Sequence, residues 1–204
     1  MKIVLATRNR NKVLELRRLA VGLAVDFGTL DEFPGAPEIV EDGLTFAENA
    51  DKKALGIWRH TGRAALADDS GLEVGALGGA PGVHSARFAG EGAGDRENVR
   101  KLLANLAGVG DSARGARFVC LLSWCDDRGR LLRFRGEVEG RILREPRGAG
   151  GFGYDPVFCP LGENRTFAEM LPEEKDSLSH RGRALALFFE SLQARLACGG
   201  GSAP

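Results

Sequence analysis

The sequence predicts an α/β protein, because short apolar segments rich in Ile, Val and Ala alternate along the chain with longer segments of helical period. The chain opens in this way: the apolar run KIVLA (2–6) is followed by the polar stretch TRNRNK, after which apolar residues recur at helical spacing from Val13. A length of 204 residues, with 43% hydrophobic and 27% charged residues, fits one domain with a substantial core, at most divided into two lobes.

Later segments carry their own signals. Thr45 and Glu48 form a capping box at the start of a helix over 45–58. The other expected elements are a strand over 63–67, a helix over 95–108 with Asp95 as N-cap, a hairpin about the turn DDRG within 117–143, a loop and strand over 152–160, and a helix over 179–197 capped by Ser179. The last residues, CGGGSAP (198–204), are expected to form a flexible tail.

The overall charge and composition exclude several classes of protein. Lys plus Arg equals Asp plus Glu, so the net charge is zero and nothing indicates a nucleic-acid or membrane partner. No apolar run approaches the ~20 residues of a transmembrane helix, and the N-terminus turns polar too soon for a signal peptide. The four cysteines form no CxxC pair, which indicates reduced thiols in a cytoplasmic protein.

Charge is distributed unevenly near the N-terminus. Residues 2–18 carry six basic side chains and the single acid Glu15, whereas residues 19–51 carry only acids. This pattern has two explanations: solvated faces, or a basic pocket for phosphates beside an acidic metal site.

The stretch TRNRNK is the first candidate site. Thr7, Asn9 and Lys12 place a hydroxyl, an amide and an ammonium between a buried strand and a helix start, where backbone N–H groups are free. These groups suit a phosphate. The alternative is a capped loop with Asn11 as the N-cap.

Acidic residues suggest a metal beside this cradle. Glu41 lies in a Pro- and Gly-rich loop before the capped helix, and Asp68 and Asp69 are expected at the end of the strand over 63–67. Carboxylates suit Mg²⁺, and the absence of an HxxxH pattern or a Cys cluster argues against a transition metal. Together with the cradle, they point to phosphoryl or nucleotidyl chemistry.

The adjacent acids pose a geometric question. Neighbouring side chains of a strand point to opposite faces, so one acid faces the cleft and the other does not if the strand persists. Asp68 is then an orienting partner for a lysine such as Lys53. If the strand has already broken, Asp68 is a second metal contact.

Two further motifs lie near the C-terminus. GAGGFG (148–153) fits the GxGxxG pattern, but no helix follows it, so we expect a loop that approaches a ligand closely rather than a dinucleotide site. The cluster Lys175, Ser177, His180 and Arg181 suits an anion or a polar ring; the alternative is a salt-bridged helix start with the nearby acids.

Five segments together resemble the inosine triphosphate pyrophosphatase family, also called dITP/XTP diphosphatases or non-standard purine NTP pyrophosphatases. In chain order they are LATRNRNK, GLTFAENADKKA, ADDSGLEVGALGGAPGVHSARFAG, GGFGYDPVF and EEKDSLSHRGRAL. They span nearly the whole chain, so chance agreement is not credible.

The resemblance implies a reaction, a fold and partners. The reaction is hydrolysis of ITP, dITP or XTP to the nucleoside monophosphate and pyrophosphate with Mg²⁺, which cleanses the nucleotide pool. The implied fold is an elongated mixed β-sheet flanked by helices, with two lobes around a central nucleotide cleft. It forms a single domain over 1–197, usually as a homodimer.

The resemblance also implies roles for individual residues. Asp69 would be the general base, and Glu41 and Asp69 would bind the metal. The implied substrate-binding residues are Thr7, Arg8, Asn9, Arg10, Asn11, Lys12, Asn49, Lys53, Ser70, Phe152, Gly153, Tyr154, Asp155, Lys175, His180 and Arg181. Arg8 departs from the pattern, because many relatives have a small residue there.

Other functions remain open from the residues alone. One is a pyrophosphatase for other modified nucleotides, and another is a nucleotide-binding module in which the acids are structural. A nucleic-acid-binding protein is disfavoured by the zero net charge and by the lack of a stripe of aromatic and basic residues.

Overall fold

The computed structural model describes residues 1–22 and 25–199. Its strands and helices are β1 (Lys2–Leu5), α1 (Arg10–Leu19), β2 (Asp26–Gly28), α2 (Phe46–Thr61), β3 (Ala65–Val74), α3 (Asp95–Asn105), β4 (Gly115–Cys125), β5 (Leu131–Ile142), β6 (Phe158–Pro160), α4 (Pro172–Leu178) and α5 (His180–Gly199). All the predicted helices and strands are present. The short elements β2 and α4 were not predicted, because three and seven residues give too little periodicity.

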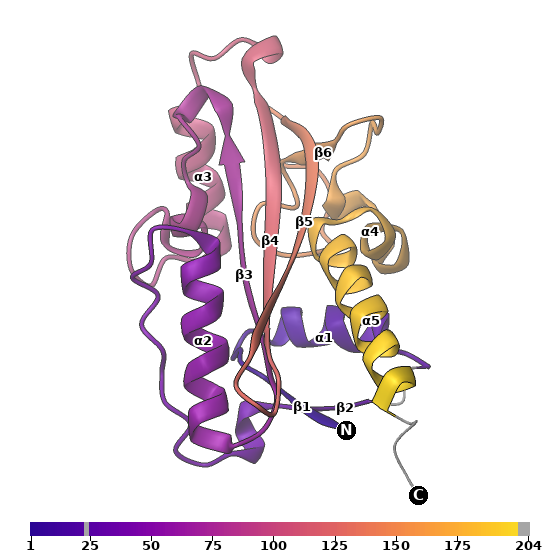
Figure 1. The fold of residues 1–204 in the computed structure, drawn as a ribbon. Coiled ribbons are helices and arrows are strands. Elements are labelled where there is room, and N and C mark those ends of the chain that lie inside the picture. The colour runs from indigo at the N-terminus through magenta and orange to yellow at the C-terminus, as the bar shows by residue number, and fades with distance from the viewer. Residues whose placement is uncertain (23–24, 200–204) are drawn as a thin grey trace, which may run out of the picture.

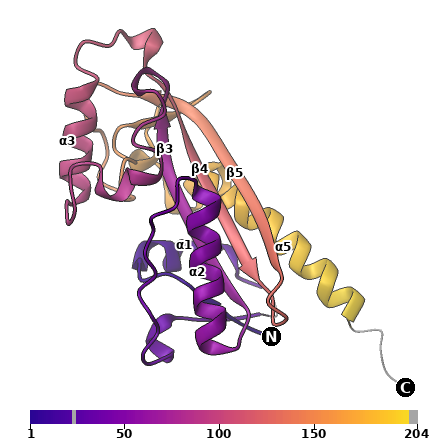
Figure 2. The same ribbon diagram turned by 60° about the vertical axis from the view of Figure 1, so that its left-hand side comes forward.

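The strands form one mixed sheet of six in the order β2-β1-β3-β4-β5-β6. β1 pairs in parallel with β2 and β3, and the remaining pairs are antiparallel. Helices α2 and α3 lie on one side of the long strands β3, β4 and β5, and α4 and α5 lie on the other (Figures 1 and 2). The predicted α/β architecture, an elongated mixed sheet flanked by helices, is therefore confirmed.

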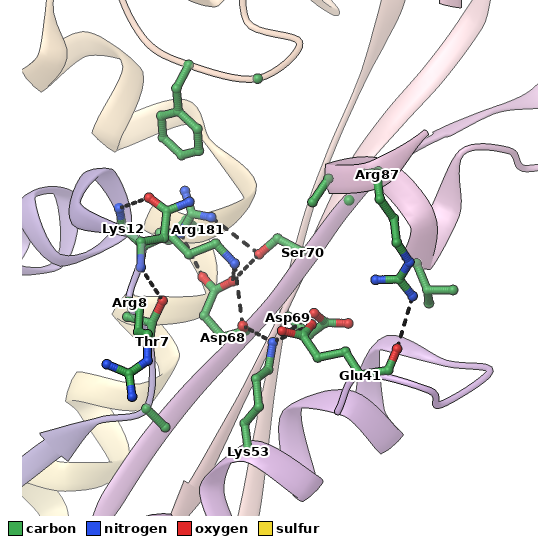
Figure 3. A pocket seen from close by; sticks show the side chains of 18 of the residues that line it. Thr7, Arg8, Lys12, Glu41, Lys53, Asp68, Asp69, Ser70, Arg87 and Arg181 are labelled. Atoms are coloured by element: carbon green, nitrogen blue, oxygen red, sulfur yellow. Dashed lines mark hydrogen bonds and ion pairs between the residues drawn. The ribbon is translucent and has the colours of Figure 1, made fainter. Parts of the chain in front are cut away.

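Strand β3 is longer than predicted. It continues through Asp68, Asp69 and Ser70 to Val74, so the expectation that it ends at the acids is wrong. The acids have little intrinsic preference for a strand, but β3 is paired with β4 from Ala65 to Val74, and this pairing outweighs local propensity. Because the strand persists, Asp68 and Asp69 point to opposite faces of the sheet (Figure 3).

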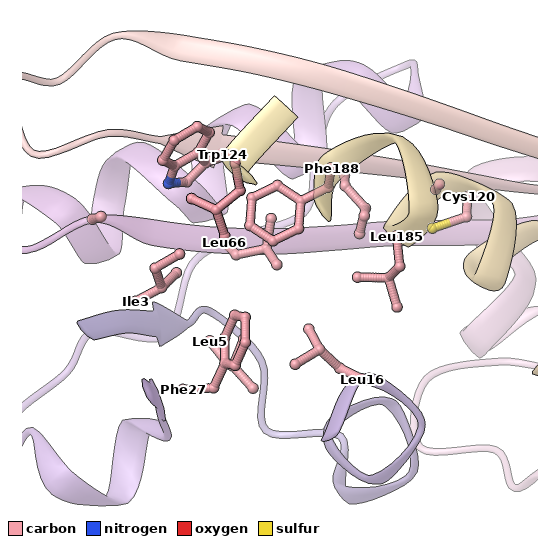
Figure 4. Packing of buried hydrophobic residues seen from close by; sticks show 13 residues of the cluster. Ile3, Leu5, Leu16, Phe27, Leu66, Cys120, Trp124, Leu185 and Phe188 are labelled. Atoms are coloured by element: carbon pink, nitrogen blue, oxygen red, sulfur yellow. The ribbon is translucent and has the colours of Figure 1, made fainter. Parts of the chain in front are cut away.

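Two hydrophobic clusters flank this polar part of β3. The first packs Leu66 with Trp124 and with Leu185 and Phe188 of α5 (Figure 4). The second packs Leu72 and Val74 with Leu102 of α3. Asp68, Asp69 and Ser70 lie between these clusters, which form the cores of the two lobes.

Two helix starts differ from what the sequence suggested: the alternative to the phosphate cradle had Asn11 as N-cap, and Asp95 was the predicted N-cap of the helix over 95–108. Asn9, rather than Asn11, is the N-cap of α1, because its side-chain oxygen accepts hydrogen bonds from the N–H groups of Asn11 and Lys12 at 3.0 and 3.3 Å. Asp95 is the first residue of α3, and the N-cap is Gly94. At α5 the prediction holds: Ser179 Oγ accepts from the N–H of Gly182 at 3.0 Å.

Several other predictions bear on the described residues. Cys120, Cys125 and Cys159 are free thiols, whereas the side chain of Cys198 lies outside the described residues. Helix α5 ends at Gly199, and residues 200–204 of the predicted tail lie outside them too. Within residues 1–22 and 25–199, no helix combines the length and apolar character needed to cross a membrane.

Helix α5 sits directly on the backbone of β5. A Cβ atom at Gly136 would lie 2.1 Å from the carbonyl oxygen of His180 and 2.5 Å from the nitrogen of Ala184. Such distances are well inside van der Waals contact, so only glycine permits this approach. Position 136 therefore sets how closely the start of α5 approaches the sheet.

We expect Gly136→Ala to lower the free energy of unfolding by about 1–3 kcal/mol or more, because backbone must move to accommodate the methyl group. Gly108→Ala is the matched control, since a Cβ at Gly108 would meet no atom within 4 Å. Urea unfolding of both variants measures the effect. Equal midpoints for the two variants would contradict this account of the α5–β5 contact.

Candidate active site

A cavity of about 810 Å³ lies where the two lobes meet. It brings together segments that are far apart in the sequence. They are the loop after β1, the loop over residues 37–42, the middle of β3, the 3-10 helix Gly82–Arg87, the loop over 152–155, and residues of α4 and α5. Parts of all five sequence segments therefore line one space.

On one face of β3, Asp68 is held by two cations. Its carboxylate accepts hydrogen bonds from Lys12 Nζ of α1 at 2.6 Å and from Arg181 Nε of α5 at 2.7 Å (Figure 3). Burial opposes ionisation, but the charges of Arg181 and Lys12 outweigh it and hold the pKa of Asp68 well below its ordinary value. Asp68 is therefore a fixed anion that joins α1 and α5 to the sheet.

The charge network continues behind Arg181. Arg181 also donates to Glu15 of α1, and Lys175 Nζ of α4 donates to Glu15 at 2.8 Å and to Asp155 at 2.7 Å. Asp155 in turn accepts a hydrogen bond from the N–H of Phe152 at 2.8 Å. The network thus runs from the middle of β3 to the loop that carries Phe152.

On the opposite face of β3, Asp69 shares a lysine with Glu41. Lys53 Nζ of α2 donates to Asp69 Oδ1 and to Glu41 Oε2, at 2.9 Å in both cases (Figure 3). Burial raises the pKa of Asp69 to about 6 despite the attraction of Lys53, and the neighbouring Glu41 carboxyl adds to the rise. In Glu41, burial is outweighed by Lys53, and the pKa is lowered. Asp69 therefore titrates close to neutral pH.

The loop after β1 presents the N-terminus of α1 to the cavity. Thr7, Arg8, Asn9 and Lys12 line the cavity, and α1 has no acidic residue in its first turn. The positive end of the dipole of this ten-residue helix favours an anion, although the N–H groups of Asn11 and Lys12 already donate to Asn9 Oδ1. Arg8 extends away from this turn, and its Nη2 donates to the carbonyl of Ala36 at 3.1 Å.

His180 is a buried imidazole at the cavity wall. It stacks on Phe118, with ring centroids 4.7 Å apart and planes 8° from parallel. Burial, reinforced by Arg181, lowers its pKa well below the ordinary value, so the ring is neutral at neutral pH. Its Nδ1 has no hydrogen-bond partner within the described part of the chain. A buried polar atom of this kind is suited to a ligand group.

The lining of the cavity carries more negative than positive side chains. Among the described residues, eight carboxylates face six cations there. The carboxylates are Glu38, Glu41, Asp42, Asp68, Asp69, Glu91, Asp95 and Asp155, and the cations are Arg8, Lys12, Lys53, Arg87, Lys175 and Arg181. This surplus of negative charge favours binding of a cation, or of an anion that brings a cation with it, over binding of an anion without a counter-ion. Within the described residues, no group of three or more His, Cys, Asp or Glu side chains is arranged to hold a metal ion.

Known proteins share both the sequence and the fold. The model of the Ham1 family matches residues 3–191. The chain belongs to the Ham1 family. It is 53% identical to a protein of Desulforamulus reducens named dITP/XTP pyrophosphatase. The 192 aligned residues cover 94% of this chain and 96% of the relative. It is 50% identical over 196 residues to one of Mycobacterium tuberculosis with the same name, covering 95% and 96%.

Solved structures agree with this assignment. A HAM1 protein from Coxiella burnetii superposes with a TM-score of 0.87 at 44% identity, covering 95% of this chain and 99% of that one. A nucleoside-triphosphatase, dITP/XTP pyrophosphatase, from Mycobacterium abscessus gives a TM-score of 0.76 at 46% identity, with 92% and 97% covered. The resemblance predicted from five sequence segments, and the fold class that it implied, are confirmed.

Most of the residues that the sequence nominates in this Ham1 chain converge on the cavity, but three do not line it. Arg10 and Asn11 are exposed residues in the first turn of α1. Asn49 is fully buried: its Nδ2 donates to Asp69 Oδ2 at 3.3 Å and its Oδ1 accepts from the N–H of Gly43 at 2.8 Å. Asn49 therefore orients Asp69 and the loop that carries Glu41.

Tyr154 lines the cavity but belongs to the hydrophobic core of one lobe. Its hydroxyl donates to the carbonyl of Ser85 at 2.8 Å. Phe152 is half-buried, and its ring lies 4.8 Å from Lys175 Nζ and 5.5 Å from the guanidinium carbon of Arg181. Of the two aromatic side chains, Phe152 is therefore the better placed to stack on a base.

Sequence reasoning missed several residues of this Ham1 site. Glu15 was noted only as the single acid of residues 2–18, although it is buried and binds both Lys175 and Arg181. Its spacing of three from Lys12 puts it on the same face of α1, which is the signal that could have found it. Arg87 and Asp95 line the cavity as well: Arg87 lies within the third of the five segments but was given no role, and Asp95 was expected only as a helix N-cap.

The neighbouring acids are expected to affect stability with opposite signs. The folded protein binds a proton at Asp69 near pH 6 and the unfolded chain near pH 3.8, so ionised Asp69 destabilises the fold above pH 6. Without added divalent cation, Asp69→Asn should raise the free energy of unfolding at pH 8 by about 1–3 kcal/mol, and the gain should vanish below about pH 4.

Asp68→Asn is the control for this prediction. The pKa of Asp68 is lowered, so its contribution is present above its unfolded pKa and is lost as the pH falls through its folded pKa. At pH 8 this variant should lose about 3–5 kcal/mol, because Lys12 loses its carboxylate partner and the buried Arg181 keeps only Glu15. Denaturant unfolding of both variants as a function of pH measures the effects, and a shift of the same sign in both would contradict the assignment.

Proposed function

We propose that this chain is a Mg²⁺-dependent nucleoside triphosphate pyrophosphohydrolase. It converts the non-standard purine nucleotides ITP, dITP and XTP to the monophosphate and pyrophosphate, and so cleanses the nucleotide pool. The observation that carries the proposal is the single cavity in which a helix N-terminus suited to phosphates faces the Asp69–Lys53–Glu41 group. Membership of the Ham1 family and relatives named dITP/XTP pyrophosphatase support it.

The donor set fits Mg²⁺. Glu41 and Asp69 point their carboxylates at one shared ammonium, so both reach a common position, and the lining has a surplus of negative charge. Mg²⁺ is commonly held by one or two carboxylates together with waters and substrate phosphates. Glu41 and Asp69 would hold the ion. When bound, it supplies neutralising charge for the phosphate oxygens.

Asp69 is suited to be the general base. In the proposed reaction water attacks the α-phosphorus and pyrophosphate leaves. A base with a pKa of about 6 is ionised at neutral pH yet basic enough to take a proton from that water. Asn49 holds one carboxylate oxygen and Lys53 the other, so the carboxylate is oriented before substrate arrives. This fits the positioning on which phosphoryl transfer depends.

Phosphate binding is assigned to the first turn of α1 and to the cations around it. Thr7, Asn9 and the turn that follows them would contact the triphosphate at the positive end of the α1 dipole, with Lys12 and Lys53 adding positive charge near the leaving group. Both lysines are anchored by acids of β3, which fixes their positions without removing their charge. Arg8 is the cation of this region that the family pattern does not anticipate.

Base recognition is assigned to His180, Phe152 and the surrounding charges. The neutral His180 keeps Nδ1 for a ligand group, and Phe152 offers a ring for stacking. The backbone N–H groups of Phe152 and Gly153 already donate to Asp155 and Asp95. Lys175 and Arg181 are further donors for the 6-keto oxygen of hypoxanthine or xanthine. Adenine carries an amine there and would leave buried donors unpaired, which is how hydrogen-bond readout discriminates.

Other sequence-based expectations stay predictions. They are the homodimer, the cytoplasmic location and the absence of nucleic-acid and membrane partners. The single domain over 1–197 is likewise a prediction.

The substrate range can be tested by pyrophosphate release from ITP, dITP, XTP, GTP and ATP, with and without Mg²⁺. We expect Mg²⁺-dependent release, with kcat/KM for ITP exceeding that for ATP by a factor on the order of 10²–10⁴. Reactions without protein serve as the control. Equal rates on ATP and ITP would overturn the cleansing role, and release without a divalent cation would overturn the metal requirement.

The role of Asp69 can be tested with Asp69→Asn. We expect nucleotide binding to persist and turnover to fall by roughly 10²-fold or more, which is the usual scale for loss of a general base. Asp111→Asn is the control, because Asp111 is exposed, does not line the cavity and pairs with Arg144. Calorimetric binding and single-turnover rates separate the two effects. Near-wild-type turnover in Asp69→Asn would contradict the assignment of Asp69 as the general base.

A further inference from the structure

Asp95 contacts the loop that carries Phe152, although neither the sequence pattern nor the proposed chemistry requires it. Its Oδ2 accepts a hydrogen bond from the N–H of Gly153 at 2.7 Å, across a separation of 58 residues. Asp95 is the first residue of α3, and both residues line the cavity. The contact therefore joins the start of α3 to the loop over 152–155 at the cavity wall.

The loop has few other means of holding Gly153 in place. Gly153 has a φ of +61°, and a Cβ built there would meet no atom within 4 Å, so no neighbour packs against the side-chain face of this residue. The preceding N–H, of Phe152, is held by Asp155 in the buried network of Lys175. Two successive backbone N–H groups are thus held by two carboxylates, one of them buried and the other the exposed Asp95.

The hydrogen bond from the N–H of Gly153 to Asp95 is stronger than one between two neutral groups. A carboxylate that accepts from a backbone N–H makes a charge-assisted hydrogen bond. Asp95 also lies in the first turn of a helix, where the helix dipole stabilises a negative charge. A loop held in place before its ligand arrives loses less conformational entropy on binding.

We propose that Asp95 is a positioning residue for base recognition: it fixes Gly153, and through Gly153 the ring of Phe152, in the arrangement that receives the purine. This inference rests on the proposed function, in which Phe152 stacks on the base. Asp95 acts through the loop and touches neither the phosphates nor the reacting atoms. Loss of Asp95 should weaken binding of the base half of the nucleotide and leave binding of the phosphates unchanged.

The test compares two probes that divide the substrate. IMP carries the base, the sugar and one phosphate, whereas inorganic pyrophosphate occupies only the phosphate region. In Asp95→Ala we expect calorimetric affinity for IMP to fall about tenfold, the effect of losing one charge-assisted hydrogen bond, with pyrophosphate affinity unchanged within about twofold. With ITP, KM should rise about tenfold while kcat changes by less than about twofold, the signature of lost ground-state binding.

Two further variants separate positioning from helix stability. Asp95→Asn keeps a side-chain oxygen that can accept the Gly153 N–H, so it should recover IMP affinity to within about threefold of wild type. Glu97→Ala is the matched control. It removes a carboxylate from the same turn of α3, one that accepts from the N–H of Gly94 at 2.8 Å, and it does not contact the loop. IMP affinity in Glu97→Ala should equal that of wild type.

The outcomes decide between the explanations. Unchanged IMP affinity in Asp95→Ala, an equal loss in Glu97→Ala, or an equal loss of pyrophosphate affinity would each overturn the proposal. IMP binding does not depend on turnover, so failure of the wild-type protein to release pyrophosphate from ITP would count against the proposed function alone.

A measurement on the unchanged protein covers the case in which Asp95→Ala does not fold. The Gly153 amide should exchange with deuterium more slowly by at least tenfold than an unprotected glycine amide, because its hydrogen is bonded to Asp95. NMR resolves single amides for this purpose. Exchange of the Gly153 amide at the unprotected rate would overturn the proposal.

Discussion

Adjacent side chains on an unbroken strand point to opposite faces of the sheet, and the arrangement of this site depends on that constraint. Asp68 faces α1 and α5, where it fixes Lys12 and Arg181, while Asp69 faces α2, where it meets Lys53. Asp68 thus organises the structural charges, and Asp69 is the carboxylate to which the proposed function assigns the chemistry. A bend between them would turn both carboxylates to one side and leave the cations of the other side without a partner.

The buried network around Asp68 connects β3 with α1, α4 and α5. Desolvating these charges is expensive, and their mutual attraction offsets the cost only while each has its partners. Arg181 satisfies Asp68 and Glu15 together, and Lys175 satisfies Glu15 and Asp155, so no member of this set is left alone. We interpret the network as specifying where α1, α4 and α5 lie around the cavity.

Asp69 is the carboxylate that burial disfavours in the folded protein. Its raised pKa means that the folded state holds an ionised carboxylate that burial disfavours at neutral pH. The hydrophobic clusters on either side of it, around Leu66 and around Leu72, provide the stability that tolerates this. A bound cation would relieve the same strain, so substrate, metal and stability are expected to be coupled at this position.

The sequence by itself determined the α/β class, the capping box at Thr45, the strand–loop–helix start and the five segments that mark the family, because these signals are local and periodic. It did not determine that β3 continues through its acids, since strand pairing with β4 overrides local propensity. Nor could it assign partners. Arg181 binds Asp68 and Glu15 across separations of 113 and 166 residues, and Asn49 of α2 turns inward to Asp69 of β3 across 20 residues. Only the tertiary structure decided those contacts, because burial and charge pairing act between neighbours in space rather than in sequence.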